Sequence, residues 1–288
     1  MTLRARLKDK KIVVAPGVYD GLTASLAEAA GFEALYLSGA AVSYTRLGRP
    51  DIGLSTSSEM ADTMMLISDR TNLPVIIDAD TGFGNALNAQ RTMRIYERAG
   101  ASALQLEDQT YPKRCGHLAD KSLITTSEMS GKIMAMADAR ASQNTLIIAR
   151  TDAIAVEGFA AATDRAEAYL EAGADVLFIE APENREQLER ITKQFSDRVP
   201  LLANMVEGGA TPITDADDLE SQGFGIVIFP GGIVRALART AADYYKSLAT
   251  SGSNKPFAER MFDFDGLNAV IGTASMLEKG ALYDDTES

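Results

Sequence analysis

The sequence predicts a (β/α)8 barrel, that is, a TIM barrel, with a C-terminal helical extension, and three observations support this fold class. Eight short apolar segments alternate with eight windows of helical periodicity, which is the element order of a parallel barrel. At four places a helical window ends at a glycine and passes into an apolar segment. The length of 288 residues also fits one barrel domain, which takes about 250 residues.

The repeated unit is a helix end, a glycine and a strand, and it occurs over residues 27–37, 96–106, 169–179 and 219–229. We expect its glycines to adopt the left-handed conformation that ends a helix. Four further strands are expected over 12–15, 73–77, 145–149 and 199–203. The strands are almost continuously apolar, which is typical of strands buried on both faces of a parallel sheet.

Helices are expected where apolar residues recur at helical spacing: 20–30, 57–70, 86–99, 127–141, 159–172, 185–195, 215–221 and 233–249. A doubly wound open sheet is the alternative arrangement of these elements. No linker rich in Gly, Pro or Ser divides the chain, so we predict a single domain over 1–288. Residues 251–288 form its extension, partly helical over 257–280, and we expect this extension to pack on a neighbouring subunit.

The composition limits the classes of partner and compartment. A net charge of −12 argues against nucleic acid and anionic membranes as partners. The single cysteine excludes an internal disulfide. The charged N-terminus does not resemble a signal peptide, and no apolar run approaches the roughly 18 residues of a membrane span. We therefore expect a cytoplasmic protein. If its substrate is an anion, it needs a metal ion or local Arg and Lys side chains.

The only cysteine and the only histidine lie two residues apart, in Lys113-Arg114-Cys115-Gly116-His117. Positive charge from Lys113, Arg114 and a protonated His117 favours the thiolate, so we expect a lowered pKa for Cys115. Gly116 gives this segment freedom to move. The pattern indicates an acid–base or nucleophilic cysteine on a mobile loop, and a basic surface turn with an incidental cysteine is the alternative.

Polar residues follow six successive expected strands at their C-terminal ends, where barrels place catalytic residues. They are Tyr36, Ser38, Gly39, Asp78, Asp80, Glu107, Arg150, Asp152, Glu180, Asn204 and Glu207. Carboxylates brought this close repel one another unless a cation lies among them. Asp78, Asp80 and Glu107 offer hard oxygen donors, which suit Mg²⁺ or Mn²⁺ better than zinc. The sequence therefore predicts a divalent-metal site on this rim.

Each of these residues also has a structural interpretation. Asp80 and Glu107 fit helix N-caps or solvated loop acids. Arg150 fits a purely structural ion pair with Asp152 or Glu180. The glycine-rich stretch 81–85 resembles a phosphate loop but is too short for a nucleotide-binding fingerprint.

Together these motifs resemble the isocitrate lyase and phosphoenolpyruvate mutase superfamily over residues 15 to about 236. The segment Lys113–His117 is similar to the gating loop of its methylisocitrate lyase, 2,3-dimethylmalate lyase and carboxyvinyl-carboxyphosphonate phosphonomutase group. The other matching motifs are Ala15–Asp20, Tyr36–Gly39, Leu47–Gly53, Asp78–Asn85, Glu107–Gln109, Ile148–Ala153 and Leu202–Gly209.

The resemblance implies a role for each matching residue. Asp80 would ligate Mg²⁺, or Mn²⁺ in its place, and Asp51, Asp78 and Glu107 would hold the water ligands of the metal. Cys115 would act as general acid and Tyr36 as base or oxygen stabiliser. Arg150 and His117 would serve both catalysis and substrate binding, and the remaining substrate contacts would be Ser38, Gly39, Gly116, Glu180 and Asn204.

The implied activity is that of a Mg²⁺-dependent carbon–carbon lyase. It would cleave a 2-hydroxy di- or tricarboxylate, of the 2-alkylmalate or methylisocitrate type, to an α-keto acid and a carboxylate. Two departures bear on the substrate. Gln105 stands where many family lyases carry His, and the tail at 260–266 does not resemble the methylisocitrate lyase tail that supplies an Arg to a third carboxylate. The second departure favours a dicarboxylate.

Three other readings stay open at this point. One is carbon–phosphorus bond formation, as in the phosphonomutases. Another is hydrolysis or decarboxylation of oxaloacetate. The last is a non-catalytic barrel that binds a metabolite. The resemblance further implies a homotetramer built from dimers that exchange a C-terminal helix.

Overall fold

The computed structural model describes residues 1–116, 120–209, 211 and 215–283. It divides into two compact units, Met1–Val234 and Arg235–Ser288, and each is described by itself. His117 lies outside the described residues. Among the residues that are described, no helix is both long and apolar enough to span a bilayer. The expectation of one domain over 1–288 stays a prediction.

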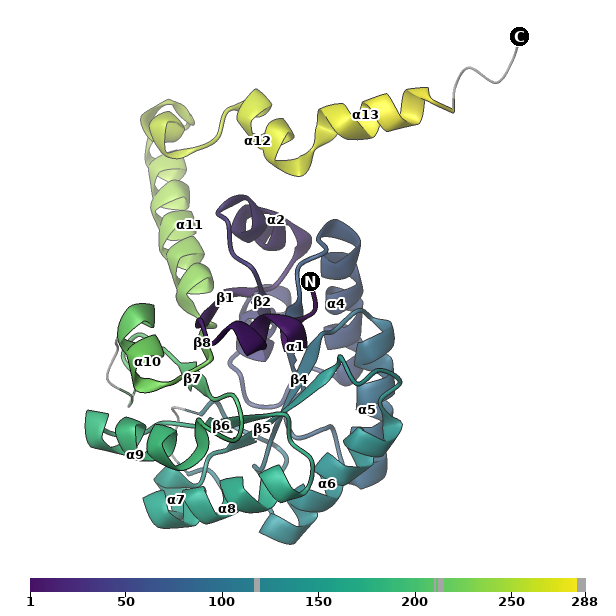
Figure 1. Cartoon of the computed structure of the whole chain (residues 1–288). Helices are drawn as coiled ribbons and strands as arrows, with labels where there is room; N and C mark the ends of the chain where they lie inside the picture. The colour runs from purple at the N-terminus through teal and green to yellow at the C-terminus, as the bar shows by residue number, and fades with distance from the viewer. Residues whose placement is uncertain (117–119, 210, 212–214, 284–288) are drawn as a thin grey trace. The chain divides into compact units, whose positions relative to one another are not determined.

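The first unit is built on an eight-stranded parallel sheet (Figure 1). The strands are β1 (Val13–Val18), β2 (Leu35–Leu37), β3 (Val75–Asp78), β4 (Ala103–Glu107), β5 (Leu146–Thr151), β6 (Val176–Ile179), β7 (Leu202–Asn204) and β8 (Ile226–Phe229). Their order is β6-β5-β4-β3-β2-β1-β8-β7, and a parallel bridge between Leu177 and Leu201 joins β6 to β7. The predicted barrel is confirmed, and the open doubly wound alternative is wrong.

Helices follow the strands and surround them (Figure 1). The helices of this unit are α1 (Leu3–Arg6), α2 (Gly21–Ala29), α3 (Gly39–Val42), α4 (Ser57–Arg70), α5 (Ala86–Arg98), α6 (Thr126–Ala139), α7 (Ile154–Glu157), α8 (Phe159–Glu171), α9 (Arg185–Phe195), α10 (Ala216–Gln222) and the start of α11 (Gly232–Ser251). A short 3₁₀ helix, η1 (Leu7–Asp9), and a π-helix, η2 (Ser43–Leu47), complete it. The four-residue helices α3 and α7 were not expected, because one turn is too short to show helical periodicity.

Local sequence signals set the helix ends. Gly31, Gly100, Gly173 and Gly223 have φ angles of 88°, 101°, 106° and 103°, so the expected left-handed helix ends are confirmed. Capping boxes begin α2, α4 and α5: the side chain of the residue before the helix accepts a hydrogen bond from the backbone N–H of the third helical residue, whose side chain accepts one from the backbone N–H of the residue before the helix.

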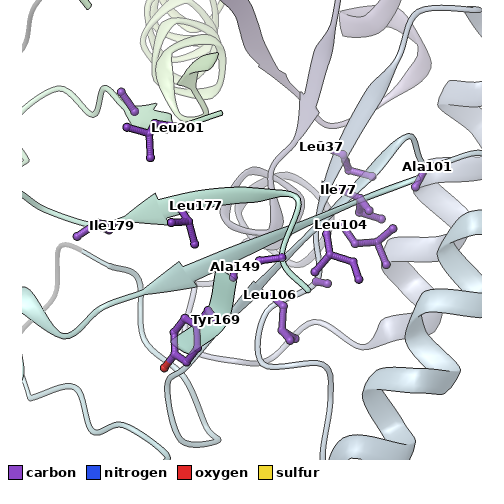
Figure 2. Close-up of a cluster of buried hydrophobic side chains, with 14 of the residues drawn as sticks. Leu37, Ile77, Ala101, Leu104, Leu106, Ala149, Tyr169, Leu177, Ile179 and Leu201 are labelled. Atoms are coloured by element: carbon purple, nitrogen blue, oxygen red, sulfur yellow. The ribbon is translucent and has the colours of Figure 1, made fainter. Parts of the chain in front are cut away.

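Successive strand residues face opposite sides of the sheet, and this alternation divides the core in two. Leu37, Ile77 and Leu104 belong to the larger cluster, which includes the side chains drawn in Figure 2. Tyr36 and Ile148 belong to the second cluster, with the inward-facing residues of the barrel. The same alternation decides which polar residues near the strand ends face the barrel axis.

The second unit contains the rest of α11, the 3₁₀ helix η3 (Lys255–Arg260), α12 (Phe264–Ile271) and α13 (Thr273–Ala281). Phe257 is 5% exposed and packs edge-on against Tyr244, with 5.5 Å between ring centroids. The expected helical extension is thus present. Its exchange between subunits stays a prediction.

Candidate active site

Strand alternation collects polar side chains at one end of the barrel. In β3, Asp78 has the same facing as Ile76, and in β4 Gln105 and Glu107 have the same facing as Ala103. The register pairs Asp78 with Gln105 and Glu107 with Arg150. Because the strands are parallel, these four residues lie at the neighbouring C-terminal ends of β3, β4 and β5.

A buried lysine lies among the carboxylates that we call the acidic ring, namely Asp51, Asp78, Asp80 and Glu107. Nζ of Lys113 lies 2.6 Å from Oδ1 of Asp51 and 2.8 Å from Oδ1 of Asp80. The Lys113 side chain is only 3% exposed. Burial alone would lower the pKa of Lys113, but the carboxylates of Asp80 and Asp51 outweigh it and hold that pKa well above its usual value. The ammonium is therefore the cation that the acidic ring holds in this structure.

Burial dominates the electrostatics of the ring. It raises the pKa of Asp80 to about 7, against the opposing charge of Lys113 and with the support of Asp78 and Asp51. It also raises the pKa of Glu107 well above its usual value, although Arg150 and Lys113 pull it down. An added cation would stabilise the ionised form of these buried carboxylates.

Gln105 links two site residues. Its Oε1 accepts a hydrogen bond of 2.6 Å from the hydroxyl of Tyr36, and its Nε2 donates one of 3.3 Å to Oδ1 of Asp78. Gln105 is fully buried. Burial, together with the negative charge of Asp78, raises the pKa of Tyr36 well above its usual value. Tyr36 is therefore a neutral donor in this structure.

Arg150 is the centre of a second buried charge cluster. Its Nε lies 2.9 Å from Oδ2 of Asp152 and 3.4 Å from Oε2 of Glu107. Its Nη2 lies 3.2 Å from Oε2 of Glu180, which also accepts a 3.0 Å hydrogen bond from Nδ2 of Asn204. Burial would lower the pKa of Arg150, but Asp152, Glu180 and Glu107 hold it well above its usual value.

The segment Lys113–Gly116, the thiol segment below, lies against both clusters. The backbone N–H of Cys115 donates to the carbonyl of Asp51 at 3.3 Å. A Cβ built on Gly116 would lie 2.2 Å from Nη2 of Arg150 and 3.0 Å from Oε2 of Glu180. The backbone of Gly116 therefore rests on the Arg150–Glu180 pair, where only glycine fits. Cys115 itself is partly buried.

Two residues with left-handed backbone lie at the site. Asp80 has φ of 46° and Ala181, directly after Glu180, has φ of 57°. Such backbone is costly for residues other than glycine, and it concentrates at functional sites. The Ala181 turn also lets its N–H donate to Oε1 of Glu180 at 2.9 Å, which holds the carboxylate in place.

Ser38 and Gly39 begin the short helix α3 beside the acidic ring. Oγ of Ser38 accepts a 3.2 Å hydrogen bond from the N–H of Ala41. A Cβ on Gly39 would lie 3.0 Å from Oδ2 of Asp78 and 3.6 Å from Oδ1 of Asp80. The two carboxylates therefore converge on the backbone at Gly39.

The donor set fits a divalent cation of the magnesium type in its chemistry. Oε1 of Glu107 is buried without a hydrogen-bond donor among the described residues, and Oδ1 of Asp80 has the Lys113 ammonium at 2.8 Å. Carboxylate oxygens are the ligands that Mg²⁺ prefers. In the part of the chain that the structure describes, no three Asp, Glu, His or Cys side chains are already arranged as a metal-binding group. Instead, the Lys113 ammonium lies between the carboxylates of Asp51 and Asp80.

Two features of this site were not anticipated. The ammonium of Lys113 points to the acidic ring, and no sequence signal indicates its direction. Lys121 forms a 2.8 Å ion pair with Asp152, and both side chains are at least 98% buried. A lysine within six residues of the lone cysteine was the available clue.

Known proteins resemble this chain over nearly its whole length. The profile of the family described as phosphoenolpyruvate phosphomutase matches residues 3–249. A 2,3-dimethylmalate lyase of Eubacterium barkeri is 41% identical over 276 residues, which are 96% of this chain and 95% of that protein. A 2-methylisocitrate lyase of Aeropyrum pernix is 46% identical over 272 residues, which are 94% of this chain and 87% of that protein.

Solved structures give the same picture. The crystal structure of a 2,3-dimethylmalate lyase matches with a TM-score of 0.93 at 36% identity, covering 99% of this chain and 94% of that one. A phosphonopyruvate hydrolase solved in complex with oxalate and Mg²⁺ matches with a TM-score of 0.87 at 32% identity, covering 98% of this chain and 99% of that one.

Proposed function

We propose a reaction for this chain on the premise of its family: the chain belongs to the phosphoenolpyruvate phosphomutase family and is a carbon–carbon lyase of the isocitrate lyase and phosphoenolpyruvate mutase superfamily. The reaction is cleavage of a 2-hydroxy dicarboxylate of the 2-alkylmalate type to an α-keto acid and a carboxylate. Cys115 is the general acid and Mg²⁺ the cofactor.

One observation supports this proposal above the others. An acidic ring, a buried arginine and the chain's only thiol segment meet at one end of the barrel, in direct contact through Asp51 and Gly116. A basic surface turn with an incidental cysteine would not rest on a buried Arg150–Glu180 pair.

Each step of the cleavage needs one of these groups. The C2 hydroxyl must lose its proton, and we assign its acceptance to the carboxylate of Glu107, beside Arg150. The electron pair of the hydroxyl oxygen then forms the new carbonyl as the C2–C3 bond breaks, and C3 leaves as the enolate of a carboxylate. Cys115 donates its thiol proton to C3, which completes the second product.

Other residues of the chain orient the substrate and offset charge. Arg150 and the backbone at Ser38 and Gly39 face the α-carboxylate, and neutral Tyr36 stabilises the developing carbonyl oxygen by donating to it. Gly116 and Asn204 line the side of the distal carboxylate. His117, which the resemblance places with them, lies outside the described residues.

Asp80 would hold Mg²⁺ directly, with Asp51, Asp78 and Glu107 around its water ligands. When bound, the metal supplies Lewis-acid polarisation of the hydroxyl and carboxylate oxygens. The Mg²⁺ of the phosphonopyruvate hydrolase structure supports this assignment.

A substrate panel tests the proposal. The protein is incubated with Mg²⁺ and 2,3-dimethylmalate, 2-methylmalate, methylisocitrate, isocitrate, oxaloacetate or phosphonopyruvate, and α-keto acid release is followed. We expect the alkylmalates to be cleaved and Cys115→Ser to lose about a hundredfold or more in rate, the scale of a general acid. Full activity of Cys115→Ser would exclude the assigned role of the thiol. Turnover of phosphonopyruvate without turnover of any hydroxy acid would replace the lyase assignment with phosphonate chemistry.

A further inference from the structure

A second buried lysine lies beside the thiol segment. The side chain of Lys121 is 2% exposed, and its Nζ lies 2.8 Å from Oδ1 of the fully buried Asp152. The same Nζ donates a short hydrogen bond to the carbonyl oxygen of Gly116. One ammonium therefore joins the backbone next to Cys115 to a carboxylate of the barrel.

Asp152 is a rigid attachment point for this ammonium. Its carboxylate accepts two hydrogen bonds from Arg150, at 2.9 Å and 3.1 Å, and its backbone N–H donates to Oδ1 of Asp108 at 3.0 Å. Asp108 is itself fixed, because its Oδ2 accepts from Thr151 at 2.7 Å and from Tyr169 at 2.8 Å. The barrel wall thus holds Asp152 from behind.

The backbone on either side of the Cys115 side chain is tied down. The N–H of Cys115 donates to the carbonyl of Asp51 at 3.3 Å, and the carbonyl of Gly116 accepts from Lys121. Position 116 has no space for a side chain, because a Cβ on Gly116 would lie 2.2 Å from Nη2 of Arg150. The direction of the Cys115 side chain therefore depends on both ties, and Lys121 supplies one of them.

We propose that Lys121 is a positioning residue for the general acid: through Gly116 it fixes the Cys115 thiol relative to Arg150 while its own charge is balanced by Asp152. The inference rests on the proposed function for the role of the thiol. Lys121 makes no contact with substrate in this account, so its loss should affect proton delivery far more than binding.

Alkylation of the thiol tests directly whether the hydrogen bond from Lys121 to Gly116 fixes Cys115. Cys115 is the chain's only cysteine, so the rate of its modification by iodoacetamide, followed by mass spectrometry, reports one site. We expect Lys121→Met to raise this rate about tenfold, the scale of one lost hydrogen bond to a charged group. We also expect kcat on the best alkylmalate to fall at least tenfold, with KM within threefold of that of the wild type. Lys121→Arg, which keeps the charge, should stay within threefold of the wild type in alkylation.

Two further variants separate positioning from general loosening. Arg6→Met removes another buried cation, paired with Glu33 near the opposite end of the strands, and should lower the melting temperature without changing alkylation. Lys121→Gln keeps an N–H donor for Gly116 and should alkylate at an intermediate rate, which decides the matter even where Lys121→Met does not fold.

The two proposals fail in different ways. A wild-type alkylation rate in Lys121→Met, or in Lys121→Gln where Lys121→Met does not fold, overturns the positioning role. A wild-type protein that cleaves no hydroxy acid overturns the proposed function and leaves the alkylation result standing.

Discussion

Removing the ammonium of Lys113 is the sharpest perturbation of the acidic ring. Lys113→Met keeps most of the side-chain volume and leaves Asp51 and Asp80 buried, at 9% and 7% side-chain exposure, without their partner. Loss of one member of a buried ion pair costs roughly 3–5 kcal/mol. Burial already raises the pKa of Asp80 to about 7, so a proton takes up part of the loss near neutral pH, and the lower end, about 3 kcal/mol, is expected.

The assay is a thermal melt with and without metal. A loss of about 3 kcal/mol corresponds to a drop of about 6–12 °C in melting temperature for a chain of this size. Mg²⁺ should restore part of this drop, and it should raise the melting temperature of the variant more than that of the wild type, because no ammonium competes for the carboxylates. A tenfold tighter metal affinity adds about 1.4 kcal/mol at high metal concentration.

The exposed lysine Lys193 on α9 supplies the matched control, since Lys193→Met should change stability by less than about 0.5 kcal/mol. If Lys113→Met without metal melts within 1 °C of the wild type, the ammonium is not what balances the ring. Equal shifts with Mg²⁺ in both proteins would show that metal and ammonium do not compete.

Three further predictions address the rest of the site and the assembly. Gly116→Ala should lower kcat/KM about a hundredfold while the protein stays folded, because the new Cβ would lie 2.2 Å from Arg150. Gly131→Ala on α6 is the control. A Cβ there has nothing within 4 Å, so this variant should be active and up to about 1 kcal/mol more stable in melts. Arg150→Lys should lose roughly a hundredfold in kcat/KM, because an ammonium cannot reproduce the two-point contact with Asp152, and wild-type kinetics would contradict this. Light scattering should give a homotetramer for the full chain and a smaller species for a chain ending at residue 251, and a monomeric full chain would refute the expected exchange of C-terminal helices.

The barrel could be predicted because its signals are local. A glycine after each of four helical windows requires a left-handed helix end, and Gly31, Gly100, Gly173 and Gly223 all have positive φ. The facing of the polar residues also follows from the sequence once the strands are known, because alternation is fixed by strand geometry. The sequence therefore predicts that these side chains gather at one rim, and their roles there stay predictions.

The partners of long side chains could not be predicted. Lys113 was expected to act on the neighbouring thiol, whereas its ammonium reaches Asp51, 62 positions away in the sequence. Lys121 pairs with Asp152, 31 positions away. A lysine side chain has four rotatable bonds, so its ammonium can reach any carboxylate that the tertiary structure brings near. Separation in the sequence therefore says little about which carboxylate it pairs with. The expected lowering of the pKa of Cys115 stays a prediction.

Charge balance bears on the metal and the anionic substrate that we propose for this rim. In the described part of the site, three buried cations face a larger set of buried carboxylates: Lys113, Lys121 and Arg150 against Asp51, Asp78, Asp80, Glu107, Asp152 and Glu180. Arg150 and Lys121 are committed to Asp152 and Glu180, so the excess of negative charge falls on the acidic ring. A dicarboxylate, the proposed substrate class, would be repelled by that ring, because like charges at short range are unfavourable in a buried site. Under the proposed function, a divalent cation held by Asp51, Asp78, Asp80 and Glu107 would offset most of this excess negative charge, and Arg150 would face the substrate's carboxylate from the second charge cluster.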